Sequence, residues 1–382
     1  MDYNKILIRY GELTLKGENK KDFIRQLHNN LSWYIEKSEI KTEYDRAFVD
    51  YSQKNLDCLK YIFGISSYSP VYETETSLIN IENIVKEIIS KKQFDSFAIN
   101  ARRHNKNFSM TSSELNMYFG GIVLKQMPDK QVKLKNPDLT IYIEIRDQRS
   151  FVFCDYFDGL GGMPVLSSGK CIHLISGGID SPVAANLLQK RGLKIVFLNF
   201  ITPPQTDEKT IAKIDEIVNI LKKYQGNAML YQINYSKVME YIGLISNQKY
   251  KITLMRRSFY RIANLIAKKE NIKAISNGEN LAQVASQTLE SIYTISEVCD
   301  LPIFRPLISF DKNETIAIAK KINTLDVSIV RACETCELFA PKNPVTKPNR
   351  QEAYKLEEEE LPLIKEFENE CIENAIIKKY SI

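Results

Sequence analysis

The chain contains no apolar run of about 18 residues, the length at which a helix becomes able to cross a bilayer. Its first residues, Met1 to Lys5, are not followed by the apolar segment and small-residue cleavage site of a secretory signal. Internal repeats and low-complexity tracts are also lacking. These absences exclude a membrane-spanning or secreted protein, and we expect a cytoplasmic protein without a membrane partner.

Neither sign of charge dominates, because 52 Lys and Arg residues are balanced by 47 Asp and Glu residues, and the net charge is only +5. Such a small excess permits nucleic-acid binding but does not argue for it. Tryptophan is nearly absent, since Trp33 stands alone beside 20 Tyr and 17 Phe. With 44% hydrophobic and 26% charged residues among 382, the composition is that of a globular protein of two or three domains. It excludes a disordered, collagen-like or small disulfide-rich chain.

Cysteine is sparse, and its seven thiols should be mostly reduced in the cytoplasm. Cys333 and Cys336 form a CxxC pair, which can carry redox or metal chemistry. No second CxxC exists, so a four-cysteine zinc site is disfavoured. The remaining cysteines are isolated in sequence and are expected to be small buried hydrophobic residues: Cys58, Cys154, Cys171, Cys299 and Cys371.

The first part of the chain mixes helical and strand patterns. Strands are predicted at residues 5–10, 96–100 and 140–145, and helices at about 21–36, 81–91 and 112–126. We interpret this part as two small α+β units in series, at residues 1–70 and 71–160.

A glycine-rich stretch, Gly159 to Gly162, and the turn Ser167-Ser168-Gly169 mark the main domain boundary, after which we place a third domain at residues 161–382. Here predicted strands alternate with helices, which indicates βαβ units and a doubly wound parallel sheet. The acidic row Glu357 to Glu360 is expected to be a solvated helical face. The strands are predicted at 171–175, 194–200, 228–235 and 273–276, and the helices at 183–190, 206–224 and 251–269.

The most informative stretch is SGGIDS, residues 176–181, which follows an apolar strand and precedes a helix. Gly177 and Gly178 let the backbone approach an anion, and the N–H groups of the helix start point at a phosphate. Ser176 and Ser181 add hydroxyl donors, while Asp180 is expected to help hold a metal ion that bridges phosphates. The lysine of a Walker loop is missing. The alternative is a generic glycine turn.

The SGGxDS pattern resembles the PP-loop of N-type ATP pyrophosphatases, which adenylate a carbonyl oxygen and release pyrophosphate. Four more blocks resemble the ThiI family of tRNA 4-thiouridine sulfurtransferases, in the family's order and over nearly the whole chain. They are IRYGELTLKG at 8–17, FSMTSSELN at 108–116, NGENLAQVASQTLE at 277–290 and CELFAPKNPVTKP at 336–348.

The resemblance implies an α/β multidomain fold: a ferredoxin-like α+β domain, a THUMP domain that binds RNA, and a doubly wound PP-loop domain. It also implies that the enzyme makes 4-thiouridine at position 8 of tRNA. ATP, with Mg²⁺, would activate the uracil O4 as an adenylate, and a cysteine persulfide charged by a cysteine desulfurase would supply sulfur. The alternatives are a PP-loop enzyme that adenylates another RNA base, and a sulfur carrier for thiamine thiazole synthesis.

The nucleotide site is carried over from the family by position, and it agrees with the rule that doubly wound sheets bind ligands at the carboxyl ends of their strands. Arg256 is expected to neutralise phosphate or adenylate charge, unless it is a surface arginine. Asn199 stands where the family commonly has histidine, so any role of an imidazole there is lost. Beyond the loop itself, the implied residues are Leu174, Ile175, Asn199, Phe200, Arg256, Gly278 and Gln287.

Cys336 matches the family's sulfur-accepting cysteine, whereas Cys333 is a departure that creates the CxxC pair. Cys333 could resolve the persulfide or close a disulfide after transfer. Alternatively, both thiols ligate an iron–sulfur cluster with a third cysteine, or Cys333 has no role. Many relatives carry a further rhodanese domain, for which we expect no room in a chain that ends at Ile382.

Affinity for RNA should come mainly from contacts between basic side chains and phosphates, although each of these charges could simply be solvated. Phe108 could stack on an unpaired base. The THUMP resemblance implies recognition of the acceptor end of tRNA. Relatives act on tRNA as dimers, so a homodimer is possible, but the sequence does not fix the oligomeric state. The candidate basic residues are Lys16, Arg102, Arg103, Lys106, Lys133 and Lys135.

Overall fold

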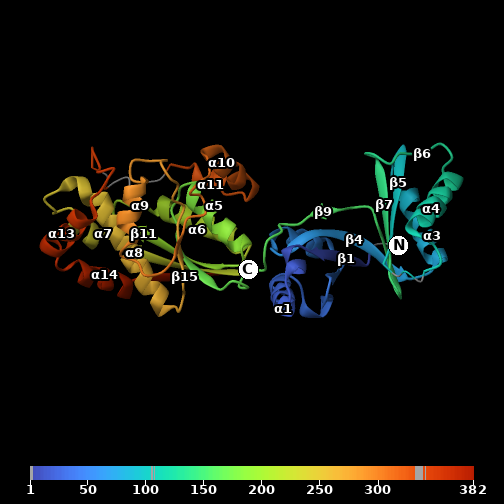
Figure 1. Cartoon of the computed structure of the whole chain (residues 1–382), viewed down its shortest axis with the longest axis horizontal. Helices are drawn as coiled ribbons and strands as arrows, with labels where there is room; N and C mark the ends of the chain where they lie inside the picture. The colour runs from blue at the N-terminus through green and yellow to red at the C-terminus, as the bar shows by residue number, and fades with distance from the viewer. Residues whose placement is uncertain (1–2, 105, 107, 332–338, 340) are drawn as a thin grey trace. The chain divides into compact units, whose positions relative to one another are not determined.

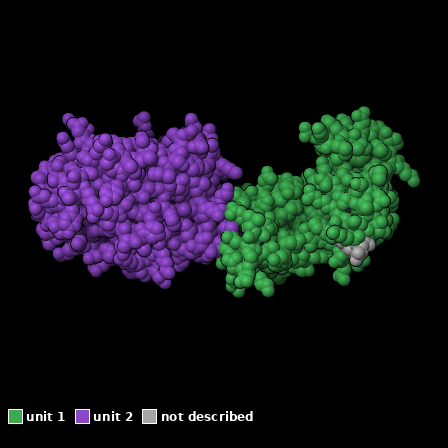
Figure 2. Space-filling view, in the orientation of Figure 1, with its two compact units in different colours: residues 1–162 green, residues 163–382 purple. Residues whose placement is uncertain are grey.

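The computed structural model describes residues 3–104, 106, 108–331, 339 and 341–382. The chain divides into two compact units, residues 1–162 and 163–382 (Figure 2). The predicted start of the third domain, residue 161, lies beside this division. Within the described residues, no helix combines the length and the apolar character that crossing a membrane requires.

The first unit is built on one continuous sheet with the strand order β2-β3-β1-β4-β8-β7-β5-β6, and β9 also pairs with β4 (Figure 1). Its long strand β4 pairs with β1 through residues 65–71 and with β8 through residues 72–75. Residue 70, where we predict the first domain to end, is therefore inside a strand that serves both predicted domains. The strands are β1 (Lys5–Tyr10), β2 (Ile40–Thr42), β3 (Arg46–Asp50), β4 (Ile65–Glu75), β5 (Ser96–Arg103), β6 (Gln131–Val132), β7 (Leu139–Ile145), β8 (Arg149–Phe153) and β9 (Phe157–Asp158).

Helices of the first unit bury their apolar faces in two separate cores, one under each half of the sheet. A third cluster, with Phe48, Phe151 and Phe153, lies where the halves meet. The helix predicted at 21–36 ends at Leu31, because a turn after it carries Ile35 into the core. The helices are α1 (Lys20–Leu31), α2 (Gln53–Cys58), α3 (Leu78–Lys91) and α4 (Ser112–Gln126).

The second unit has a six-stranded sheet in the order β14-β13-β10-β11-β12-β15, in which β15 alone is antiparallel to its neighbour. The chain leaves β10 toward β11 and β12, and later returns to the other side of β10 with β13. The carboxyl end of β10 is thus a topological switch point, where open α/β sheets bind ligands. The strands are β10 (Lys170–Leu174), β11 (Lys194–Ile201), β12 (Asn227–Asn234), β13 (Ile275–Ser276), β14 (Ile303–Phe304) and β15 (Ile376–Ser381).

Both faces of this sheet are covered, as the prediction of a doubly wound fold requires (Figure 1). Alternate residues of a strand face opposite sides. Ile172, Val196 and Leu198 join a core with α7, α8, α13 and α14, while α5 and α6 contact β11 and β12. The helices are α5 (Asp180–Lys190), α6 (Glu208–Lys222), α7 (Ser236–Ile242), α8 (Lys251–Lys269), α9 (Leu289–Ser296), α10 (Lys312–Lys321), α11 (Leu325–Ser328), α13 (Arg350–Glu360) and α14 (Ile364–Glu373).

The acidic row on α13 is only partly a solvated face, so that expectation is wrong for Glu357. Its carboxylate accepts hydrogen bonds from Arg257 at 2.8 Å and from Arg261 at 2.6 Å, and both arginines are on α8. Arg257 is 1% exposed, so a buried guanidinium needs this partner. Glu358 and Glu359 are exposed as expected.

Candidate active site

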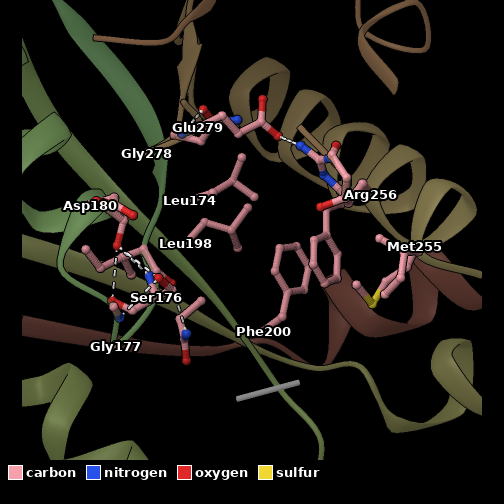
Figure 3. Close-up of a pocket in the computed structure, with 18 of the residues that line it drawn as sticks. Leu174, Ser176, Gly177, Asp180, Leu198, Phe200, Met255, Arg256, Gly278 and Glu279 are labelled. Carbon is pink, nitrogen blue, oxygen red and sulfur yellow. Dashed lines mark hydrogen bonds and ion pairs between the residues drawn. The ribbon is translucent and has the colours of Figure 1, made fainter. Parts of the chain in front are cut away.

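One pocket of about 550 Å³ lies at the carboxyl ends of β10, β11 and β13, within the size range of small-molecule sites. In Figure 3 the loop with Ser176, Gly177 and Asp180 lies on one side, and Arg256 and Phe200 on the other. All twelve residues predicted for the nucleotide line it: Leu174, Ile175, Ser176, Gly177, Gly178, Asp180, Ser181, Asn199, Phe200, Arg256, Gly278 and Gln287.

Internal hydrogen bonds close the loop of residues 176–181 on itself. The backbone N–H of Ser176 donates to Ser181 Oγ at 2.9 Å, and that hydroxyl donates back to the Ser176 carbonyl at 3.1 Å. Gly178 N–H donates to Ser176 Oγ at 3.3 Å. Among the described residues, no side chain caps the N-terminus of α5. The serines therefore shape the loop, and the helix start is left to bind an anion.

Gly278 follows β13 and lies directly against this loop. A Cβ atom at Gly278 would be 2.6 Å from the backbone N of Ser181 and 2.8 Å from the carbonyl carbon of Asp180. Both are backbone atoms, which cannot rotate away as a side chain can. Glycine is therefore required because of the close approach of two backbone segments.

The carboxylate of Asp180 faces two donors from distant parts of the chain. Lys312 Nζ, at the start of α10, is 2.8 Å from Oδ1, and Gln283 Nε2 donates to Oδ2 at 2.9 Å. An ammonium group thus lies where the sequence predicts a metal ion beside Asp180. Among the described residues, no three His, Cys, Asp or Glu side chains gather as metal ligands. The Asp180 carboxylate alone therefore fits a cation that is also held by the phosphates of a bound ligand.

Arg256 is held in a buried cluster of charges at the far side of the pocket. It forms an ion pair with Glu279 and donates to the carbonyl of Ser286, while Arg305 Nε donates to the same Glu279 at 2.6 Å. Burial acts to raise the pKa of Glu279, but the two guanidinium groups outweigh it and hold the pKa at about 2. The carboxylate stays ionised and fixes the position of Arg256.

Between these polar ends the pocket is apolar. The rings of Phe200 and Phe259 stack with centroids 3.8 Å apart and planes 11° apart. Asn199 Nδ2 donates to the Ile175 carbonyl at 3.1 Å, which leaves its buried Oδ1 with no partner among the described residues, and the same holds for Gln287 Oε1. Unpaired buried acceptors are costly. They fit a ligand that brings N–H or O–H donors, as adenine and ribose do.

The predicted sulfur-carrying residues, Cys333 and Cys336, lie outside the described residues. Described residues lie close by in the chain: Phe339 packs against the core of the second unit with Lys251 Nζ 5.1 Å from its ring centroid, and Pro344 lines the pocket.

The predicted RNA-contacting residues are all in the first unit, but they do not form one cluster. Lys16 is in the ferredoxin-like half, where its ammonium is 4.9 Å from the ring centroid of Phe23. The others lie at opposite ends of β5, about 20 Å apart at the usual rise per residue. Phe108 packs partly buried against a core, and Arg103 donates to its carbonyl at 3.0 Å. The exposed basic residues of the set are Arg102, Lys106, Lys133 and Lys135.

Three side chains of the pocket region were not anticipated: Lys312, Glu279 and His173. The Asp-x-x-Glu capping box at residues 311–314 marks the start of α10 in the sequence, but nothing local pairs Lys312 with Asp180. Glu279 stands in the NGEN block, from which the family resemblance implies only Gly278 as a site residue. No sequence signal distinguishes His173 from any other strand residue.

Sequence models of known protein families match three successive parts of the chain. The sequence model of the family described as thiamine biosynthesis protein (ThiI) matches residues 166–362. Models of the ThiI ferredoxin-like domain and of the THUMP domain match residues 5–69 and 75–155. The chain belongs to the ThiI family. The expected family and the expected three-part fold are both confirmed.

This ThiI-family chain is 63% identical over 380 residues to a probable tRNA sulfurtransferase of Metamycoplasma arthritidis, with 99% of each chain covered. It is 55% identical to the corresponding protein of Mycoplasmopsis agalactiae, with 98% of each covered. Among solved structures it is similar to a 4-thiouridine synthetase in complex with RNA and bound ATP. That match has a TM-score of 0.92 and 32% identity, and it covers 100% of both chains.

Proposed function

We propose that this chain is an ATP-dependent tRNA sulfurtransferase that makes 4-thiouridine at position 8 of tRNA. The observation that carries the proposal is the pocket in which the loop of residues 176–181, including Asp180, lies together with Arg256. Membership of the ThiI family supports it, as does the full-length similarity to a 4-thiouridine synthetase solved with RNA and ATP.

In the first step the uracil O4 attacks the α-phosphorus of ATP and pyrophosphate leaves. The uncapped start of α5 and the guanidinium of Arg256 would stabilise the negative charge that develops on the phosphates. The rings of Phe200 and Phe259 give the adenine an apolar wall. Asn199 Oδ1 and Gln287 Oε1 would accept hydrogen bonds from the nucleotide.

Asp180 is the residue that would hold Mg²⁺, which would supply positive charge against the phosphates of the nucleotide. Lys312, which pairs with Asp180 in this structure, would then be released toward the phosphates. Its ammonium would compensate the charge of pyrophosphate as it leaves. Asp180 and Lys312 thus exchange partners, and each keeps an opposite charge beside it.

In the second step the terminal sulfur of a persulfide on Cys336 attacks C4, and AMP leaves with the former O4. Cys333 would attack Cys336 Sγ, so that the new sulfur stays on C4 and the two cysteines form a disulfide. A dithiol reductant would reopen the pair, and a cysteine desulfurase would recharge Cys336. The alternatives remain that both cysteines ligate an iron–sulfur cluster, or that Cys333 has no role.

Chain connectivity supports sulfur delivery to the pocket. Cys336 is three residues from Phe339, which packs on the core of the second unit, and three extended residues span about 11 Å at most. Pro344, eight residues after Cys336, lines the pocket itself. The residue that would carry the sulfur is therefore followed, eight positions later in the chain, by one that lines the pocket.

The proposal is tested by pyrophosphate release from ATP, with and without unmodified tRNA, and by mass analysis of the product nucleoside. We expect tRNA-dependent release and 4-thiouridine. Another modified nucleoside would identify the alternative enzyme, which adenylates a different base. Cys333→Ser should stop turnover if Cys333 resolves the persulfide, and wild-type activity would remove that role. Visible absorbance after anaerobic purification would favour the cluster.

A sulfur carrier for thiamine thiazole synthesis is the second candidate, because the matching family is described by thiamine biosynthesis. Under this function a strain that lacks the chain should grow only with added thiamine. Growth without thiamine would reject it and leave the tRNA reaction unaffected.

A further inference from the structure

His173 is a fully buried residue that the reaction does not use, and it lies beneath the loop of residues 176–181. Its Nε2 is 2.9 Å from the carbonyl oxygen of Ser181, and its Nδ1 is 2.8 Å from Ser276 Oγ. Ser276 is the residue paired with His173 across β10 and β13. The imidazole of His173 thus connects Ser276 of β13 to Ser181 in the first turn of α5.

Only one tautomer fits these contacts. A carbonyl oxygen can only accept, so Nε2 must carry the hydrogen and donate it to Ser181. Burial lowers the pKa of His173 to about 4, which keeps the ring neutral, and Nδ1 must then accept from Ser276. Burial raises the pKa of Cys171 to about 12, so its thiol stays protonated and can donate to Ser276 Oγ at 3.2 Å. The Ser276 hydroxyl and the Cys171 thiol each also lie 3.4 Å from the Ile172 carbonyl, farther than the contacts of 2.8 Å and 3.2 Å that lead toward the loop.

Ser181 is the residue at which the loop is fixed twice. Its hydroxyl closes the loop onto Ser176, and its carbonyl is held from below by His173. Gly278, two residues after Ser276, packs against the backbone of the same residue. Because these contacts converge on Ser181, they set the direction in which the start of α5 presents its N–H groups.

We propose that His173 is a positioning residue, which orients the loop of residues 176–181 for the phosphates through Ser181, and that Ser276 selects the tautomer that it needs. The proposal rests on the proposed function, since it assumes that the loop binds ATP. It concerns the KM for ATP, because a loop held in the wrong direction loses contacts to the phosphates.

Two variants separate positioning from mere packing. In His173→Gln the side-chain amide nitrogen reaches the place of Nε2 and can still donate to Ser181. In His173→Asn it reaches only the place of Nδ1. Both remove the ring, so a packing role predicts similar losses. The positioning role predicts a KM for ATP about fivefold to tenfold higher in the Asn variant than in the Gln variant, the size of one lost hydrogen bond.

Ser276→Ala provides the second test. In the wild-type background it removes the donor to Nδ1 and should raise the KM for ATP, whereas in the His173→Gln background it should add almost nothing, because no tautomer is left to select. This comparison decides the question even if His173→Asn does not fold. Thermal melting confirms that each assayed variant is folded, and tRNA affinity should stay constant throughout.

Equal KM values in the Gln and Asn variants, or an equal effect of Ser276→Ala in both backgrounds, would overturn the proposal. Failure of the proposed function would look different, because wild-type protein itself would then either show no saturable binding of ATP or form no 4-thiouridine.

Discussion

Replacing Gly278 by alanine should disable the nucleotide pocket without unfolding the second unit. The new Cβ would lie 2.6 Å from Ser181 N, where ordinary contacts begin at 3.4 Å, so the loop or β13 must shift by several tenths of an ångström. Overpacking of this kind costs about 1–3 kcal/mol. If the binding-competent loop bears that cost, the Kd for ATP rises roughly 5-fold to 150-fold.

Isothermal titration of ATP into the full chain measures this effect. Gly121→Ala is the matched control, because its Cβ would have no atom within 4 Å, and its Kd for ATP should not change. Melting curves should show that both variants are folded. A Kd for Gly278→Ala within twofold of the wild type would refute the argument that the close approach of Gly278 to Ser181 shapes the phosphate site.

Three further predictions concern charged side chains that pair with one another. Lys312→Met should lower kcat/KM for ATP at least about tenfold while tRNA binding persists, because Asp180 loses its ammonium partner and the phosphates lose a cation; pyrophosphate release measures it. Glu144→Gln should destabilise the first unit by about 3 kcal/mol in urea, since its carboxylate accepts from Arg46 at 2.5 Å within the sheet. The pKa of Glu279 is about 2 in the folded protein against 4.5 in the unfolded chain. The stabilisation from its carboxylate is therefore complete above pH 4.5 and is lost between pH 4.5 and pH 2, a change of roughly 3 kcal/mol in the free energy of unfolding. Urea unfolding at each pH measures it.

Each of these predictions has a control that can contradict it. Lys320→Met, on the last turn of the same helix as Lys312, should leave kcat/KM unchanged, and equal losses would reject the phosphate role. Glu87→Gln removes an exposed helical pair with Lys91 and should change the free energy of unfolding by less than about 0.5 kcal/mol. If Glu144→Gln also lost less than that, the result would contradict a stabilising role of the buried Glu144–Arg46 pair. Glu279→Gln should remove the extra acid sensitivity, and an unchanged pH profile would contradict the assignment.

Local pattern was enough to predict most of the second unit. Helix α8 begins and ends at the predicted residues 251 and 269, because its apolar spacing and the flanking polar residues are local properties. The strands β10, β11 and β12 were placed to within a residue at each end. The strand–glycine–helix pattern also located the loop of residues 176–181, since its geometry depends on adjacent residues.

What the sequence could not provide were contacts between residues far apart in the chain. Lys312 meets Asp180, and Ser276 meets His173, only because the sheet brings their segments together. Glu357 looks like one of four solvated acids until the buried Arg257 is seen beside it. Strand β4 likewise shows its double role only through its pairing with β1 and β8. Long-range pairing has no local signature, so residue patterns cannot reveal it.

Oxygen labelling tests whether ATP activates the uracil O4. Unmodified tRNA carrying ¹⁸O at the O4 of uridine 8 is converted with ATP and the sulfur donor, and AMP is analysed by mass spectrometry. We expect one ¹⁸O atom in AMP for each 4-thiouridine formed, because the adenylated oxygen leaves with the α-phosphate. AMP without ¹⁸O, alongside formation of 4-thiouridine, would contradict it.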